Sequence, residues 1–182
     1  MQANIALGLL ELSSIATGVE AADAMCKAAG VELVRGAVIA RGKYVIIIEG
    51  PVGEIESSMR AGAEIAGGTV LANHIIRNVH SDVYNTMDKK NPPRELGAVG
   101  MIETKDALPA IFAADAACKA AFVHLAELRP GAGGGKGFFT VCGEVGAVRT
   151  AIAAGVAAIG SDAVVSRIVL PQAHAHLAKA LC

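Results

Sequence analysis

Short runs of apolar, often β-branched residues alternate along the chain with alanine-rich segments in which small apolar residues recur at helical spacing. The runs predict strands and the segments between them predict helices. In the first half we expect strand, helix, strand, strand, helix, strand and short helix over 4–13, 17–29, 31–38, 43–49, 51–66, 69–77 and 80–87. The second half repeats this order over 97–104, 106–121, 122–129, 136–142, 144–160, 163–170 and 172–181.

Several helix ends are predicted from single residues. Gly30 is expected to cap the C-terminus of the first helix, as glycine often does. Pro51 suits the first turn of the next helix, and Gly67-Gly68 is expected to end it. In the second half Asp106 is the expected N-cap, with Pro109 in the first turn.

The second half repeats the first not only in pattern but in residues. AADAMCKAA at 21–29 returns 92 positions later as AADAACKAA at 113–121, with eight of nine residues identical. A repeat of about 90 residues is longer than the roughly 20–50 residues of a solenoid unit. We therefore predict two copies of one domain, at 1–88 and 96–182, joined by a charged, proline-bearing linker at 89–95.

The predicted order within each copy, βαββαβ, is typical of ferredoxin-like α+β domains. It predicts, in each of the two tandem domains, a four-stranded antiparallel sheet with two helices on one face. Duplication of a domain commonly serves symmetry, because a ring of n two-domain chains presents 2n similar wedges.

Composition excludes several function classes. The net charge of −1 gives no reason to expect nucleic acid or an anionic membrane as partner. No basic region precedes the apolar N-terminal run and no uncharged apolar stretch reaches about 18 residues, so we expect neither a secretory signal nor a membrane span but a soluble, cytoplasmic protein. A mean hydropathy of +0.50 favours buried interfaces and hence oligomerisation.

The four cysteines and five histidines show no metal-type spacing. Buried structural thiols are the expectation for the cysteines. His174 and His176 stand two apart on a predicted helix and point to different faces, which makes a poor metal pair. We expect no metal site, and no enzyme, because no nucleophile–base pair or carboxylate dyad emerges from the pattern.

The copies differ most between their second and third strands. The first has VIARG at 38–42 and the second PGAGGG at 130–135, with one extra residue between 121 and 136. A nucleotide-binding loop would need glycine six residues before Lys136 and Ser or Thr after it, where Pro130 and Gly137 stand. Glycines also suit a place where several chains meet at a symmetry axis, because no side chain then fills it.

These motifs together resemble those of bacterial microcompartment shell proteins. The resemblance lies in Glu103-Thr104-Lys105, the 113–121 run, Gly134-Gly135-Lys136 and the GEVGAV segment at 143–148, and it covers essentially the whole chain. With the domain duplicated, the chain is most similar to the tandem-domain class of propanediol-utilisation type. The resemblance implies a structural protein that forms homotrimers mimicking hexamers, which pack edge to edge with other shell proteins around enzymes.

The resemblance also implies roles for particular residues. A central pore for small metabolites is expected to be lined by Ile39, Ala40, Arg41, Gly42, Ala132, Gly133, Gly134 and Gly135. The family's edge lysine falls on Lys27 and Lys119. Asn78 and Gln172 stand where the family often has an arginine, so edge contacts there are expected to be weaker or different.

Some tandem members of the family hold an iron–sulfur cluster through a cysteine in the first pore loop. That position is Ala40 here, so the resemblance predicts no cluster and no other cofactor. Three Arg41 guanidinium groups around one axis would make the pore electropositive and favour anions. Two alternatives stay open: a ferredoxin-like trimer that binds a small regulatory ligand, and a redox shell protein that carries an iron–sulfur cluster.

Overall fold

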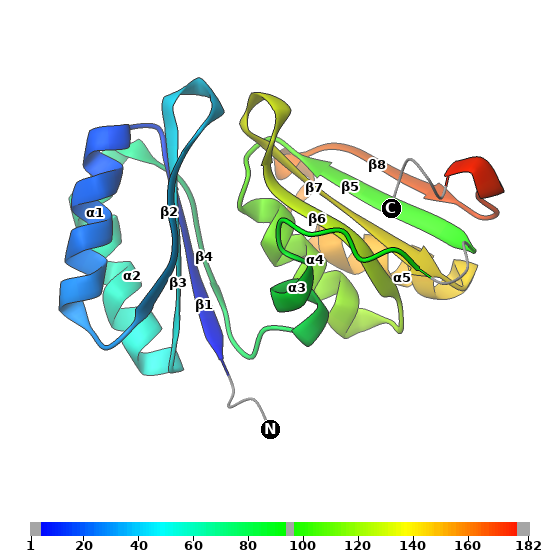
Figure 1. Cartoon of the computed structure of the whole chain (residues 1–182), viewed down its shortest axis with the longest axis horizontal. Coiled ribbons are helices and arrows are strands. Elements are labelled where there is room, and N and C mark those ends of the chain that lie inside the picture. The colour runs from blue at the N-terminus through cyan, green and yellow to red at the C-terminus, as the bar shows by residue number, and fades with distance from the viewer. Residues whose placement is uncertain (1–4, 94–96, 178–182) are drawn as a thin grey trace. The chain divides into compact units, whose positions relative to one another are not determined.

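A computed structural model of the chain describes residues 5–93 and 97–177. Contacts divide the chain into two compact units, one of Met1–Val79 with Gly133–Gly135 and the other of His80–Ala132 with Lys136–Cys182. Each unit contains one four-stranded sheet (Figure 1).

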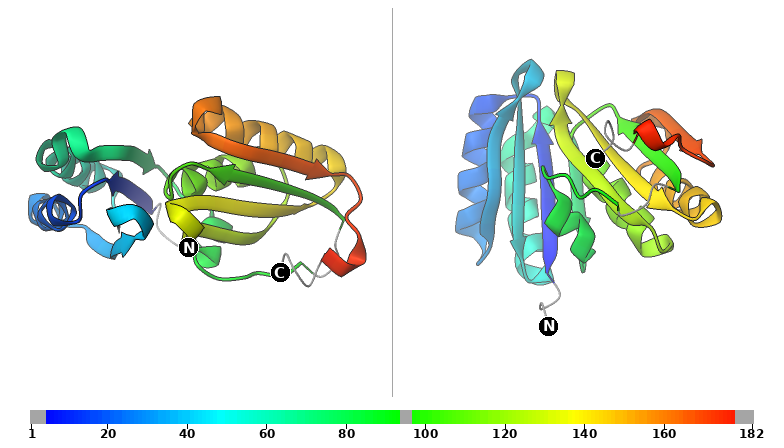
Figure 2. Two further views of the ribbon diagram at one scale, coloured as in Figure 1. Left: turned by 90° about the horizontal axis from the view of Figure 1, so that it is seen from above. Right: turned by 45° about the vertical axis from the view of Figure 1, so that its right-hand side comes forward.

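The first unit has the predicted βαββαβ order. Its elements are β1 (Ala6–Leu12), α1 (Ile15–Ala28), β2 (Glu32–Ile39), β3 (Lys43–Gly50), α2 (Val52–Ala66) and β4 (Val70–Ile76). The antiparallel sheet runs β2-β3-β1-β4, and α1 and α2 lie side by side on one of its faces (Figure 2). The core between helices and sheet includes Leu10, Met25, Ile46, Ile48 and Met59.

The second unit repeats this arrangement and adds a short helix. Its elements are α3 (Ser81–Thr86), β5 (Ala98–Thr104), α4 (Pro109–Ala120), β6 (His124–Ala132), β7 (Lys136–Gly143), α5 (Val145–Ile159) and β8 (Val164–Leu170). The sheet order β6-β7-β5-β8 matches that of the first unit, with α4 and α5 on one face. The fold class predicted from the sequence, two tandem antiparallel α+β domains, is therefore confirmed.

Three predicted helix-end residues are placed wrongly. Pro51 does not lie in the first turn of α2 but precedes the helix as its N-cap. Gly30 does not cap α1, because the chain leaves the helix one residue earlier, at Ala29, in an extended conformation. Asp106 is not the N-cap of α4. The helix begins at Pro109 and Leu108 occupies the cap position, since proline is best tolerated at the first helical residue. By contrast, Gly67 ends α2 with a φ of 51°, as its sequence position predicts.

The segment predicted as a linker lies partly along the second unit. Met87 and Lys90 form isolated bridges to Leu128 and Glu127 of β6, and Asn91 donates its backbone N–H to the Ala126 carbonyl. By contacts the second unit begins at His80, whereas the boundaries 1–88 and 96–182 stay a prediction. Of the last predicted helix, 172–181, the structure describes only a single 3₁₀ turn at Ala175–Leu177, and 178–182 lie outside the described residues.

Candidate functional site

The residues predicted to line a pore lie at the tips of two equivalent hairpins. β2 and β3 are joined by Ala40–Gly42, and β6 and β7 by Gly133–Gly135. Ile39 and Ala132 end the strands that lead into these turns. Ala40, Arg41, Gly133 and Gly134 are exposed. Each tip therefore presents backbone and short side chains, with the Arg41 side chain as the one charge among these predicted pore residues.

The two turns have the same backbone conformation. Arg41 and Gly42 have φ values of 66° and 69°, and Gly134 and Gly135 have 75° and 77°. The extra residue of the second copy lies outside its turn, in a bulge where Gly131 adopts a φ of 94°. The longer glycine run thus lengthens the strand rather than the loop.

Arg41 adopts the left-handed conformation that its counterpart Gly134 adopts without strain. For a residue with a Cβ this conformation costs roughly 1–2 kcal/mol. Glycine would suit the first turn as well as it suits the second. The conformation of Arg41 is thus a small local cost to stability, and strain of this kind is often found at functional positions.

An ion pair lies directly beneath each turn. Lys43, the first residue of β3, donates to Glu11 at 3.1 Å, and Lys136, the first residue of β7, donates to Glu103 at 2.8 Å. The Glu11 side chain is fully buried, whereas the Glu103–Lys136 pair is partly exposed. These pairs join the base of each hairpin to the neighbouring inner strand of its sheet, β1 or β5.

The predicted edge lysines differ in their surroundings. Each pairs with the aspartate four residues earlier in its helix, Lys27 with Asp23 at 2.6 Å and Lys119 with Asp115 at 2.5 Å. Lys27 and Asp23 are exposed, whereas Asp115 is buried and also accepts from the backbone N–H of His80. Asn78 and Gln172 are both exposed, and Asn78 adopts a φ of 53° at the corner between β4 and α3.

The expectation that the cysteines are buried structural thiols is wrong for Cys26. Cys26 on α1 is exposed, whereas its counterpart Cys118 on α4 is buried, as is Cys142. Burial, with the nearby Asp82 and Asp115 carboxylates, raises the pKa of the Cys118 thiol to about 12. Cys118 is therefore protonated and unreactive at neutral pH, and Cys182 lies outside the described residues.

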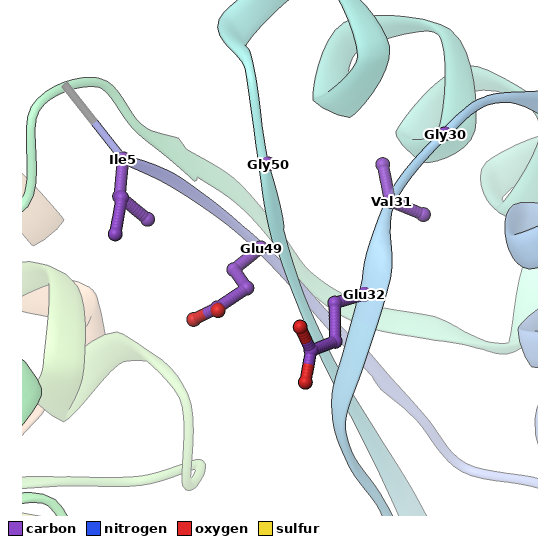
Figure 3. Close-up of a pocket in the computed structure, with 6 residues that line it drawn as sticks. All are labelled: Ile5, Gly30, Val31, Glu32, Glu49 and Gly50. Carbon is purple, nitrogen blue, oxygen red and sulfur yellow. The ribbon is translucent and has the colours of Figure 1, made fainter. Parts of the chain in front are cut away.

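A pocket of about 380 Å³ opens at one end of β2 and β3 (Figure 3). Glu32 and Glu49 are cross-strand neighbours there, and Figure 3 shows both carboxylates pointing toward the same space. Glu49 Oε2 is buried without a hydrogen-bond partner in the described part of the chain. Within that part no group of three or more His, Cys, Asp or Glu residues is placed to hold a metal ion.

His74 on β4 makes the first unit sensitive to acid. Burial lowers the pKa of His74 from its usual value of about 6.5. The unfolded chain therefore binds the proton more tightly than the folded one, and stability is lost as the pH falls through about 6.5. Hydrogen exchange of first-unit peptides at pH 7.5 and 5.5 should show lower protection at pH 5.5, with a smaller loss in His74→Gln. An equal loss in both proteins would contradict this.

The two repeated units, each with its hairpin, match a known protein domain. The BMC domain matches this chain twice, over residues 6–79 and 98–173. The chain belongs to the BMC-domain family. Within that family it is a tandem-domain protein, and the resemblance inferred from its motifs is confirmed. The family consists of structural shell proteins of bacterial microcompartments.

Some relatives of this BMC-domain protein match almost the whole chain, and others match about half of it. The bacterial microcompartment shell protein PduT of Citrobacter freundii is 35% identical over 171 residues, 93% of each chain. The carboxysome shell protein CsoS1C of Halothiobacillus neapolitanus is 41% identical over 88 residues, which is 47% of this chain and 90% of that protein. A relative with about half this length thus corresponds to one of its two domains.

Solved structures support the tandem arrangement. A microcompartment protein from Desulfitobacterium hafniense superposes with a TM-score of 0.82 at 41% identity, covering 97% of this chain and 99% of the other. The fused permuted hexameric shell protein of the RMM microcompartment gives 0.69 at 25% identity, covering 87% and 85%. Among the described residues of this BMC-domain protein, no helix has the length and apolar character needed to cross a membrane.

Proposed function

We propose that this chain is a structural tile of a bacterial microcompartment shell, in which three chains form a ring of six similar domains. The observation that carries the proposal is the pair of BMC domains in one chain, with the same strand order and the same hairpin turn in each. One structural relative, a fused permuted hexameric shell protein, agrees with six domains in a ring. Such tiles assemble with other shell proteins into a closed wall.

The tile acts by excluding and admitting molecules rather than by catalysis. In the ring the hairpin tips meet around the axis and line a pore, with Arg41 and Gly42 from one domain alternating with Gly134 and Gly135 from the other. Lys27, Lys119, Asn78 and Gln172 belong to the outer edge in this arrangement. The tile needs no cofactor, and Ala40 provides no thiolate for an iron–sulfur cluster on the axis.

Electron microscopy of the purified protein with class averaging tests the tile. Six-lobed discs with threefold symmetry, especially joined into flat sheets, are the expected result. Compact isolated particles without a sixfold outline would overturn the proposal and favour a trimer that binds a regulatory ligand. Visible absorbance of the purified protein, which is expected to be absent, separates the tile from a cluster-bearing shell protein.

Replacing Arg41 tests the character of the pore. Three guanidinium groups on one axis attract anions, so bromide soaked into crystals of the trimer should give an anomalous peak on the axis. Arg41→Glu should abolish that peak, and Arg41→Gly should abolish it while leaving stability unchanged or raised by up to about 1 kcal/mol, because glycine suits the left-handed turn. Persistence of the peak in Arg41→Glu would contradict an electropositive pore.

A further inference from the structure

The segment that follows β4 covers one side of the second unit. The His80 backbone N–H donates to Asp115 Oδ1 of α4 at 2.8 Å, and Val83 of α3 is completely buried. Farther on, the Asp88 backbone N–H donates to the Leu128 carbonyl of β6 at 3.1 Å. Figure 1 shows α3 and the strand-like stretch after it lying along α4 and β6. The end of the first repeat thus completes the domain that follows it.

The same side of the first unit has exposed residues at the equivalent positions. The side chains of Asp23 and Lys27 are 60% and 74% exposed, whereas those of Asp115 and Lys119 are 6% and 38% exposed. Cys26 is exposed where Cys118 is buried. On β2, Leu33 and Val34 are 43% and 42% exposed, and their counterparts on β6, Leu125 and Ala126, are fully buried.

The end of the second repeat begins with the same two hydrogen bonds as the segment that covers α4 and β6, although it continues as a 3₁₀ turn where that segment forms α3. Ala173 donates its backbone N–H to Gly97, as Val79 donates to Ile5. The His174 Nδ1 accepts from the backbone N–H of His176, as the His80 Nδ1 accepts from that of Asp82. The difference is burial: Leu177 is 36% exposed, whereas Val83, its counterpart, is 0% exposed. Residues 173–177 therefore resemble the start of the covering segment, but the apolar side chain of Leu177 is not buried.

We propose that residues 173–177 of one chain dock on α1 and β2 of the first domain of a second copy of this chain. The His174 backbone N–H then donates to Asp23, as the His80 N–H donates to Asp115, and Leu177 is buried as Val83 is. This inference rests on the proposed tile, in which the contact joins successive chains of the ring. Because each chain offers one docking segment and one receiving face, the contact is head to tail. Contacts of this kind form a ring when the rotation between successive copies completes a circle, and the proposed tile requires closure after three chains.

The contact predicts which surface changes separate the chains. Leu177→Glu places a charge where an apolar side chain is buried in the contact, so sedimentation velocity should show conversion of the trimer to single chains. Far-UV circular dichroism should remain that of the wild type, because Leu177 is exposed within its own chain. Ile65→Glu is the matched control: Ile65 is 41% exposed on α2, away from the proposed contact, and the variant should stay trimeric.

The thiol of Cys26 gives a second, independent measurement. In the wild-type trimer Cys26 should be protected from N-ethylmaleimide, as Cys118 is by α3, and in Leu177→Glu it should react at least tenfold faster, measured by peptide mass spectrometry. Asp23→Ala should speed the reaction in the same direction. A protected Cys26 in the trimer that becomes reactive in both variants supports the proposed contact.

Each contrary result would overturn a different proposal. A trimer that survives Leu177→Glu and has a rapidly reacting Cys26 overturns this contact and leaves the shell tile standing. A wild-type protein that is a single chain with a reactive Cys26, and forms no discs, overturns the tile itself. A single chain in which Cys26 is protected overturns docking between copies, because the segment then covers the first domain of its own chain.

Discussion

Glu11→Ala is expected to destabilise the first domain by about 3–5 kcal/mol, since it removes one partner of a buried ion pair and leaves the Lys43 ammonium without that carboxylate. The Glu11 side chain is fully buried on the inner strand β1, and the Lys43 side chain is 11% exposed. Hydrogen exchange of peptides from each domain locates the effect, because it reports stability region by region. Protection should fall in first-domain peptides.

The second repeat provides the matched control. Glu103→Ala breaks the equivalent pair, but Lys136 and Glu103 are 42% and 34% exposed, and such pairs contribute about 0–1 kcal/mol. A double variant, Glu11→Leu with Lys43→Met, removes both charges and should recover much of the loss, as apolar replacements of buried pairs often do. Equal losses in Glu11→Ala and Glu103→Ala would show that burial of the pair does not determine its contribution.

The sequence predicted the fold well because the signal was present twice. The strand and helix order of one half could be checked against the other, and the alternation of β-branched runs with alanine-rich segments is strong in both. The errors lie at helix ends. Gly30 and Asp106 are residue types that favour helix caps, yet the chain leaves α1 at Ala29 and Pro109 sets the start of α4. Cap preference is a weak signal when a neighbouring residue also fits.

The candidate site was only partly predictable. The glycines of the second hairpin predict a turn, but only the structure places the extra residue in a bulge at Gly131 and Arg41 in the left-handed conformation. Equally, 21–29 and 113–121 are almost identical in sequence, so nothing in them predicts that Cys26 is exposed and Cys118 buried. That difference comes from α3, which is distant from Cys118 in the sequence. It covers this face of α4 in the second repeat, whereas the equivalent face of α1 in the first repeat is exposed. Burial of this kind is a tertiary property.

Gly18→Ala is expected to lower the stability of the first domain by about 1–3 kcal/mol, because the helix α1 lies too close to β3 for a Cβ. A Cβ at Gly18 would lie 2.5 Å from Tyr44 Cβ and Cγ. In the second repeat the pair is reversed: Ala110 stands on the helix and Gly137 on the strand, where a Cβ would lie 2.6 Å from that of Ala110. Each helix–strand contact thus contains one glycine, on opposite sides.

This reversal makes the cost testable by a double-mutant cycle. Tyr44→Gly combined with Gly18→Ala reproduces the second repeat's arrangement, so the two changes should be less costly together than the sum of the single variants, with a coupling of about 0.5–3 kcal/mol. Gly53→Ala on α2, where a Cβ would meet nothing within 4 Å, is the control and should not destabilise. Because alanine is favoured over glycine in helices by about 1 kcal/mol, the loss in Gly18→Ala understates its steric cost. Additive single effects would mean that α1 and β3 can move apart, and that close packing does not explain the glycine in each repeat.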